Sequence, residues 1–109
     1  MTAAEFSKMA LSFPGVVKHS HFDRTAFKVE SRRIFATLHE ASGSANLKLS
    51  EVDQSVFCSF EGKTIYQVPN KWGLQGWTTF ELENISQELV LDALNVAYRE
   101  SLKTKPKRK

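Results

Sequence analysis

Cysteine is nearly absent from this chain of 109 residues, and its scarcity excludes several kinds of protein. The single cysteine, Cys58, has no partner within the chain, so no intrachain disulfide can form. Small secreted domains usually depend on disulfides, so we expect a reducing compartment and a cytoplasmic protein. Glycine (5 residues) and proline (3 residues) are also few, which excludes collagen-like and low-complexity chains.

Long apolar runs are missing as well. No apolar stretch approaches the ~18 residues that a membrane-spanning helix requires. Residues 1–5 lack the basic start of a signal peptide. With 41% hydrophobic and 25% charged residues, the composition is that of an ordinary globular domain, for which we expect no membrane partner.

Acidic residues are absent from the C-terminal end, where basic residues are dense. Residues 103–109 hold five of the 15 Lys and Arg, so residues 1–102 carry ten cations against all 12 Asp and Glu. The formal net charge of +3 therefore comes from the last seven residues, which are predicted to form a disordered basic tail. The expected organisation is one domain over residues 1–102 followed by this tail. Because the tail supplies the positive charge, the overall charge says little about the folded surface.

Two helices are marked by capping signals. Thr2 and Glu5 form a capping box at the start of the first helix, and Pro14-Gly15 ends it. Ser86 is the expected N-cap of a long helix that continues to residue 102. The residues predicted to face inward from this long helix are Val90, Leu94, Ala97 and Tyr98.

A shorter helix is predicted over residues 51–60, with Ser50 as its N-cap and Gly62 as its end. Apolar residues recur there at every fourth position, which gives an expected buried stripe of Val52, Val56 and Phe60. Cys58 lies in the same helix and is interpreted as a small core residue.

Alternating apolar and polar residues predict five strands, over residues 25–29, 34–39, 45–49, 65–68 and 77–82. The connections are mostly of hairpin length, so the sheet should be mainly antiparallel. The strand at 34–39 has apolar residues on both sides, and we expect Phe35 on an aromatic outer face. The predicted fold is an α+β two-layer sandwich of order α-β-β-β-α-β-β-α, a five-stranded sheet with helices on one face.

Several segments, in this order and spacing, resemble the MmcQ/YjbR-like family. They are Phe13-Pro14-Gly15, His21-Phe22 with Ala26-Phe27-Lys28-Val29, Ile34-Phe35-Ala36-Thr37-Leu38, Asn46-Leu47-Lys48-Leu49, and Trp72-Gly73-x-x-Gly76-Trp77. The resemblance covers nearly the whole chain before the tail. It implies a compact α+β unit described as CyaY-like, and DNA binding in a proposed double-wing mode.

Basic residues in the first half of the chain are the first candidates for contact with DNA. Arg32 and Arg33 lie in the expected turn at residues 30–33, where a wing would project, and Lys28 and Lys48 lie on outward faces of strands. Phosphates attract such side chains, and each neutralised phosphate adds to the salt dependence of binding. The alternative interpretation is an ordinary solvated face that binds nothing.

The loop at residues 69–76 offers a second projection with Lys71, Trp72 and Gln75. Exposed indoles can stack on bases, whereas buried ones fill space against a sheet. Trp77 begins a strand and is expected to pack, while both alternatives stay open for Trp72. The glycines of this loop allow a tight turn or a close approach to another backbone segment.

No catalytic motif stands out, and we expect no enzyme activity. Cys58 has no histidine nearby in sequence to activate it, and nucleophile-elbow, phosphate-loop and zinc-protease motifs are missing. His19, His21 and Asp23 alternate in a way that zinc could use. A polar turn is the simpler interpretation, and we expect neither a metal nor a cofactor.

The sequence thus predicts a monomeric, non-enzymatic DNA-binding domain. Its expected contacts are Lys28, Arg32, Arg33, Lys48, Lys71, Trp72 and Gln75. The alternative is a small module that binds an acidic peptide or a small anion in a groove formed by Trp72, Trp77, Lys48 and the aromatic face of residues 34–39. The DNA-binding hypothesis requires cations that are distant in the sequence to gather on one surface.

Overall fold

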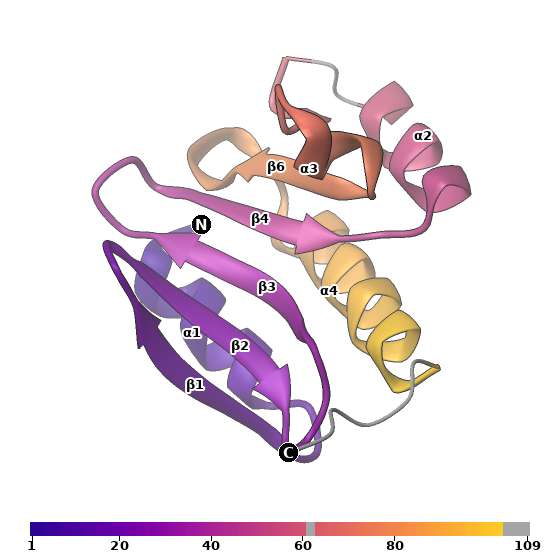
Figure 1. The fold of residues 1–109 in the computed structure, drawn as a ribbon. Helices are drawn as coiled ribbons and strands as arrows, with labels where there is room; N and C mark the ends of the chain where they lie inside the picture. Colours follow the sequence, from indigo (N-terminus) through magenta and orange to yellow (C-terminus); the bar gives the residue numbers. More distant parts are fainter. Residues whose placement is uncertain (61–62, 104–109) are drawn as a thin grey trace.

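The computed structural model describes residues 1–60 and 63–103. In this part the chain forms a six-stranded sheet of order β1-β2-β3-β4-β6-β5, in which every pairing is antiparallel (Figure 1). The strands are β1 (Val16–His21), β2 (Arg24–Val29), β3 (Ile34–His39), β4 (Ser44–Lys48), β5 (Ile65–Gln67) and β6 (Trp77–Glu81). The helices are α1 (Ala3–Leu11), α2 (Glu51–Phe60), α3 (Lys71–Leu74) and α4 (Gln87–Leu102), and a 3-10 turn (Leu82–Asn84) precedes α4.

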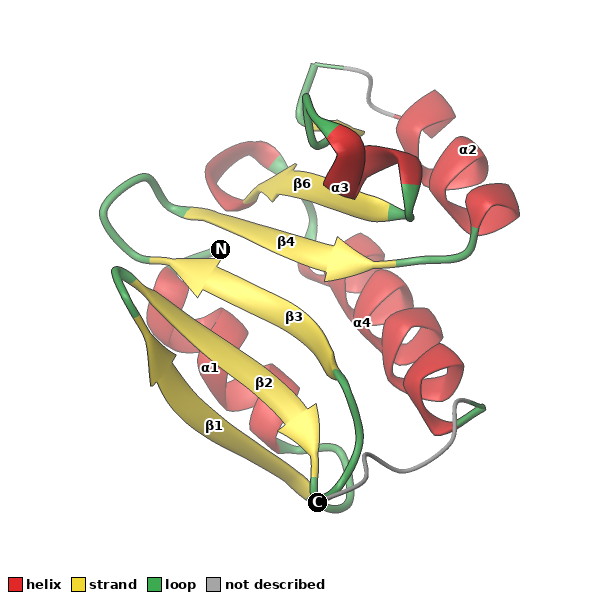
Figure 2. Ribbon diagram, in the orientation of Figure 1, coloured by secondary structure: helices red, strands yellow, loops and turns green. Residues whose placement is uncertain are grey.

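Helices α1 and α4 lie against one face of the sheet, and α3 lies on the other face beside β6 (Figures 1 and 2). The core fills the space between the sheet and α1 and α4, where Phe6 packs edge-on against Phe27 at 5.9 Å. Leu47 and Phe80 from the sheet and Leu94 from α4 are fully buried there. The predicted α+β sandwich is therefore confirmed, but its helices do not all lie on one face.

The prediction of five strands is wrong because the edge strand β1 was missed. Val16 pairs with Val29 and His21 with Arg24, so β1 runs the full length of β2. Four of its six residues, from Lys18 to His21, are exposed. An edge strand that buries so little has no apolar alternation, and its segment was interpreted as a polar turn.

The predicted buried stripe of α2 is also wrong. Val52, Val56 and Phe60 are 72%, 47% and 61% exposed, whereas Gln54 and Phe57 are buried. The Gln54 amide nitrogen donates to the backbone oxygens of Gly73 and Trp77 at 3.0 and 3.2 Å. This polar anchor fixes the rotation of the helix, and Phe57 then packs on Phe80 at 6.1 Å. The expected helix end at Gly62 lies outside the described residues.

Strand β3 contains an irregularity that moves Phe35 into the core. Phe27 pairs with Ala36 but Lys28 pairs with Ile34, so β3 holds one extra residue opposite β2. Such a bulge changes the side to which a residue points. Phe35 is 1% exposed and meets Tyr98 of α4 edge-on at 5.9 Å. The expected aromatic outer face at residues 34–39 is therefore not present.

The segment at residues 69–76 was predicted as a loop but holds the short helix α3. Asn70 is its N-cap, with its side chain accepting from the Trp72 backbone nitrogen at 2.8 Å. A Cβ added to Gly73 would lie 1.9 Å from the Val68 oxygen, and one added to Gly76 would lie 1.8 Å from the Leu49 oxygen. The glycines of the tryptophan motif therefore permit close backbone packing, as the sequence suggested.

The capping predictions are confirmed at α1 and α4. Glu5 accepts from the Thr2 backbone nitrogen at 2.8 Å, and the Thr2 hydroxyl accepts from the Glu5 backbone nitrogen at 3.1 Å. The bond from Thr2 lowers the pKa of the Glu5 carboxyl. Ser86 accepts from the Leu89 backbone nitrogen at 3.2 Å and so caps α4. None of the helices in the described part of the chain is long and apolar enough to span a membrane.

Candidate functional site

The face of the sheet opposite α1 and α4 is where the candidate residues lie, and we call it the open face. Residues paired across strands point to the same side, and each strand alternates sides. Because Leu47 and Phe80 point into the core, their neighbours Lys48 and Thr79 point to the open face. The same alternation places Lys28, which follows buried Phe27, on the open face.

Lys28 and Lys48 lie at the same end of the open face. Lys28 pairs with Ile34 at the start of β3, and Lys48 pairs with Trp77 at the start of β6. They are separated by the single strand β3, which corresponds to roughly 10 Å across the sheet. The two lysines thus lie side by side on the surface although they are 20 positions apart in the sequence.

Arg33 and Arg32 lie at this end too, in the turn between β2 and β3, but they point to different partners. Arg33 is exposed. The Arg32 guanidinium instead donates to the Leu102 backbone oxygen at 3.1 Å, at the C-terminal end of α4. A cation suits the last carbonyls of a helix, so this contact gives Arg32 a structural role.

Helix α3 brings the second group of predicted residues to the same end. The Leu49 backbone nitrogen donates to the Gly76 oxygen at 3.0 Å, which joins α3 to the end of β4 where Lys48 lies. Lys71 and Gln75 are exposed. Trp72 is 52% exposed, which answers the question left open by the sequence. Trp77 is half-buried on the open face beside Lys48.

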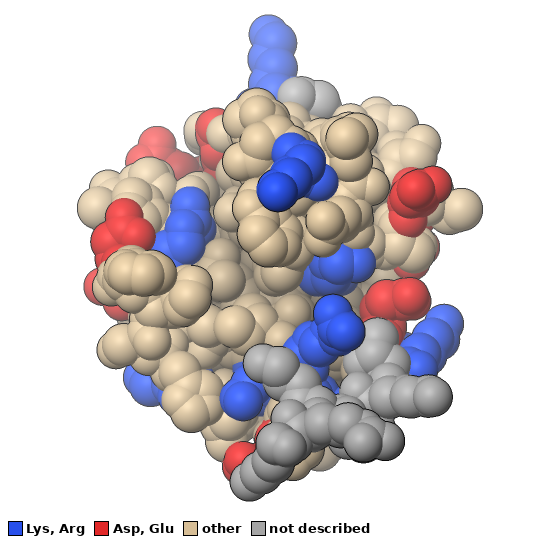
Figure 3. Space-filling model, viewed as in Figure 1, with Lys and Arg blue, Asp and Glu red and all other residues tan. Residues whose placement is uncertain are grey.

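We call Lys28, Arg33, Lys48 and Lys71 the basic end of the open face. Figure 3 shows Lys and Arg side chains following one another from α3 toward the β2–β3 turn, with Asp and Glu mostly to either side. Among the described residues, basic side chains contact carboxylates at Lys103–Glu100 and at His39–Asp23, the second being an ion pair only when His39 is protonated, and neither contact includes a member of the basic end. These four charges are therefore available to an anionic partner.

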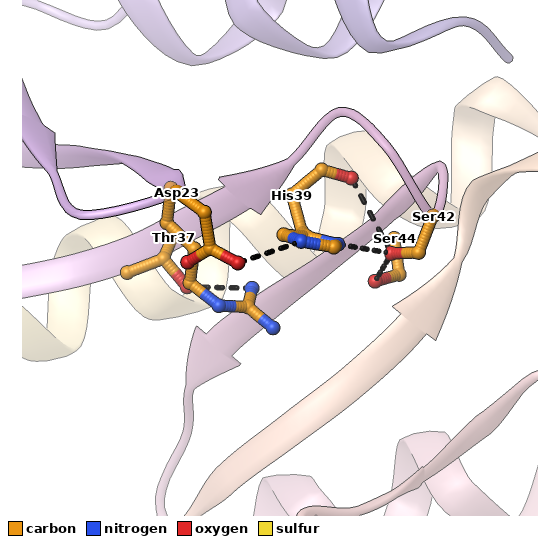
Figure 4. A network of polar contacts seen from close by, with 6 residues as sticks. Asp23, Thr37, His39, Ser42 and Ser44 are labelled. Carbon is orange, nitrogen blue, oxygen red and sulfur yellow. Dashed lines mark hydrogen bonds and ion pairs between the residues drawn. The ribbon is translucent and has the colours of Figure 1, made fainter.

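A polar network occupies the opposite end of the open face (Figure 4). The imidazole of His39 contacts the Asp23 carboxylate at 3.0 Å through Nε2 and the Ser42 hydroxyl at 2.7 Å through Nδ1. Ser42 also contacts the Ser44 hydroxyl at 2.7 Å. Two hairpin turns bring these groups together, because Asp23 lies in the β1–β2 turn and Ser42 lies in the β3–β4 turn.

A cavity of about 440 Å³ adjoins this network and shares Ser42 and Ser44 with it. Tyr66 donates to the Glu81 carboxylate at 2.6 Å, and this bond is the main reason that the pKa of Tyr66 is raised. The Thr79 hydroxyl donates to Asn46 Oδ1 at 2.8 Å. The residues that line the cavity include Arg24, Ser42, Asn46, Tyr66, Glu81 and Glu83.

Sequence reasoning missed this network because its members are separated by turns. No pattern in the sequence singles out His39 or Ser42. Asp23 pairs with His39 rather than joining His19 and His21. Residues 1–60 and 63–103 contain no group of three or more His, Cys, Asp or Glu placed to hold a metal ion. The one available signal was the short connection at residues 40–43, which places Ser42 close to His39.

The fold and these two ends define an open-faced α+β sandwich with a six-stranded antiparallel sheet. A family model named YjbR matches residues 11–100, so the chain belongs to the YjbR family. This confirms the resemblance noted in the sequence.

One solved structure shows the same fold in another protein. It is the Deinococcus radiodurans protein DR2400, described as a DUF419 domain, with a TM-score of 0.80 and 19% identity over 94% of this chain and 80% of that one. No curated protein matches the chain.

Proposed function

We propose that the domain binds DNA, with phosphates contacting the basic end of the open face. The observation that carries the proposal is the grouping of Lys28, Arg33, Lys48 and Lys71 at one end of the sheet, outside every ion pair of the described residues. Ammonium and guanidinium groups that are not paired with carboxylates can donate hydrogen bonds to the phosphates of a DNA backbone. Such binding requires no catalytic step and no second subunit.

Exposed Trp72 on α3 and exposed Gln75 at its C-cap extend this surface. An indole beside the basic end can stack on an unpaired base or lie along the sugar-phosphate backbone. The alternative groove for an acidic ligand lacks its predicted aromatic side at residues 34–39, because Phe35 is in the core. The described cavity does not include Trp72, Trp77 or Lys48. DNA binding is therefore the function that the geometry supports best.

The test compares two double variants with the same change in net charge. Lys28→Gln/Lys48→Gln removes two cations from the basic end, and Lys8→Gln/Lys63→Gln removes two exposed cations elsewhere, from α1 and from the segment after α2. Binding of a fluorescent 20-base-pair duplex is followed by anisotropy at low salt. A hydrogen bond to a charged group contributes about 1.5–3 kcal/mol, so the first variant should lose roughly tenfold or more in affinity.

The control variant should bind nearly as the parent chain does. Equal losses in the two variants would mean that DNA responds only to net charge. In that case the basic end is not a binding surface, and the proposal fails.

A further inference from the structure

The Asp23–His39–Ser42 contacts form a chain in which the Ser42 hydroxyl has two acceptors on His39, ring Nδ1 at 2.7 Å and the backbone oxygen at 3.4 Å, of which Nδ1 is the closer. A carboxylate only accepts hydrogen bonds, so the contact with Asp23 places the ring hydrogen of neutral His39 on Nε2. The other ring nitrogen, Nδ1, then accepts, and the Ser42 hydroxyl donates to it at 2.7 Å. A carboxylate, an imidazole and a hydroxyl are the groups that activate a serine in catalytic triads, here with the roles of Nδ1 and Nε2 exchanged.

The backbone holds the serine in place beside the imidazole. The Gly43 backbone nitrogen donates to the His39 oxygen at 3.0 Å, and Gly43 has a φ of +68° that turns the chain back into β4. The Ser44 hydroxyl contacts Ser42 Oγ at 2.7 Å. With the Ser42 proton directed to His39, Ser44 is the donor in this contact, and a lone pair of Ser42 Oγ stays available to an electrophile.

Asp23 acts on the imidazole mainly by orienting it, because the Asp23 carboxylate is too exposed to exert a strong electrostatic effect. Its side chain is 74% exposed, while that of His39 is 23% exposed. Exposed charges are screened by water, so the carboxylate contributes little through its field alone. It does fix the ring orientation and the tautomer, which makes Asp23 a positioning residue.

The cavity gives this serine a place for a substrate. Ser42 is one of its lining residues, and its volume of about 440 Å³ suits a small molecule. Arg24 also lines it and uses one guanidinium nitrogen on Thr37 at 3.4 Å, leaving further donors. Asn46 accepts through Oδ1, which leaves its amide hydrogens for a ligand. Donors of this kind can stabilise an oxygen that becomes negative.

We propose that Ser42 is a nucleophile toward small carboxylic esters bound in this cavity, with His39 as its general base. The Ser42 oxygen forms a bond to the acyl carbon while its proton passes to His39 Nδ1. The ester carbon–oxygen bond then breaks, and the leaving alkoxide takes this proton. Water attacks the acyl-serine by the same route, which releases the carboxylic acid and restores Ser42.

The charges of the lining select among esters. The cavity holds one cation, Arg24, and two carboxylates, Glu81 and Glu83. Esters that are uncharged or carry an ammonium group fit this balance. An ester whose acyl group carries a free carboxylate is disfavoured, because Glu81 and Glu83 repel it. The class of substrate is therefore a small ester without an anionic acyl chain.

Covalent labelling tests the nucleophile directly. A fluorophosphonate probe forms a bond between phosphorus and a serine oxygen and loses fluoride, and the proton passes to the base. We expect one adduct on the full chain, mapped by peptide mass spectrometry to Ser42. Ser42→Ala should abolish it, and His39→Gln should slow it at least about 100-fold. Ser55→Ala, on the exposed side of α2, should label as the parent does.

Far-UV circular dichroism of each variant separates loss of chemistry from loss of fold. An adduct on another residue, unchanged labelling of Ser42 in His39→Gln, or no adduct on the folded parent would each overturn the proposal. Asp23→Asn should also slow labelling without changing the spectrum, and Asp23→Glu should restore part of the rate.

Turnover of p-nitrophenyl acetate provides the second readout. The parent should hydrolyse it faster than Ser42→Ala, which retains every histidine. It should hydrolyse p-nitrophenyl hemisuccinate, with its extra carboxylate, more slowly than the acetate. Equal rates for the parent and Ser42→Ala would show that ordinary surface histidines hydrolyse the ester, and the proposed nucleophile would be refuted.

Discussion

Gly76 has the closest backbone contact of the described glycines and also a positive φ, so its replacement should be costly. Its φ is +106°, and a Cβ there would lie 1.8 Å from the Leu49 oxygen. Gly76→Ala combines backbone strain with a clash against a strand, so it should lower the free energy of unfolding by about 3 kcal/mol or more. Urea denaturation followed by tryptophan fluorescence measures this loss.

Gly43→Ala is the matched control for Gly76→Ala. Gly43 has a φ of +68°, but nothing lies within 4 Å of an added Cβ. Only the left-handed backbone penalty remains there, which is about 1–2 kcal/mol. If the two alanine variants were equally stable, the close packing of Gly76 against Leu49 would not exist in solution.

Cys58 is predicted to be an unreactive thiol. Burial raises the pKa of Cys58, so at any given pH a smaller fraction is thiolate than for a free cysteine. Alkylation of the folded protein by iodoacetamide near pH 8 should therefore be slower than alkylation of glutathione. In urea the rate should rise toward that of an exposed cysteine. A folded protein that reacts as fast as glutathione would contradict the half-buried placement of Cys58.

Helix α2 offers a prediction at the scale of the element, because its two sides differ so strongly. Phe57 is 7% exposed and Val52 is 72% exposed. Phe57→Ala should cost about 3–5 kcal/mol of stability, and Val52→Ser should change it by less than about 0.5 kcal/mol. Urea midpoints of the two variants decide whether α2 faces the core as described. A large loss of stability for Val52→Ser would mean that Val52 is buried, as the periodicity of the sequence predicts.

The elements predicted correctly from the sequence are those with local signals. The capping box at Thr2 and Glu5 and the N-cap at Ser86 involve residues three positions apart, so their hydrogen bonds depend on no distant contact. Helix α2 was placed correctly but rotated wrongly, because its rotation depends on Gln54 bonding to Gly73 and Trp77. An apolar pattern contains no information about such a polar anchor.

At the scale of the whole molecule, the sequence identifies the cations of the basic end. It does not show that they lie close together on one surface. Lys28 and Lys48 meet because β3 pairs with both β2 and β4. Arg32 is not part of the basic end, because its guanidinium donates to the backbone oxygen of Leu102 at the C-terminal end of α4. The Asp23–His39–Ser42 contacts depend in the same way on two hairpin turns at one end of the sheet. Convergence of this kind follows from strand order, which no local pattern specifies.

Salt dependence distinguishes the folded surface from the basic tail. The logarithm of the DNA binding constant falls with the logarithm of salt concentration by about 0.9 for each phosphate neutralised. Lys28→Gln/Lys48→Gln should therefore make this slope shallower by about 1.8. The same change should appear in a chain that ends at Lys103, which lacks four of the 15 Lys and Arg. Each slope is measured by anisotropy from 50 to 200 mM salt.

The shorter chain should bind more weakly and with a shallower slope, because it has fewer cations to place near phosphates. Its slope should still respond to the two lysine substitutions and not to Lys8→Gln/Lys63→Gln. If removal of residues 104–109 abolished all salt-dependent binding, the tail alone would attract DNA. The grouping of cations on the open face would then have no part in the interaction, since those charges remain in the shorter chain.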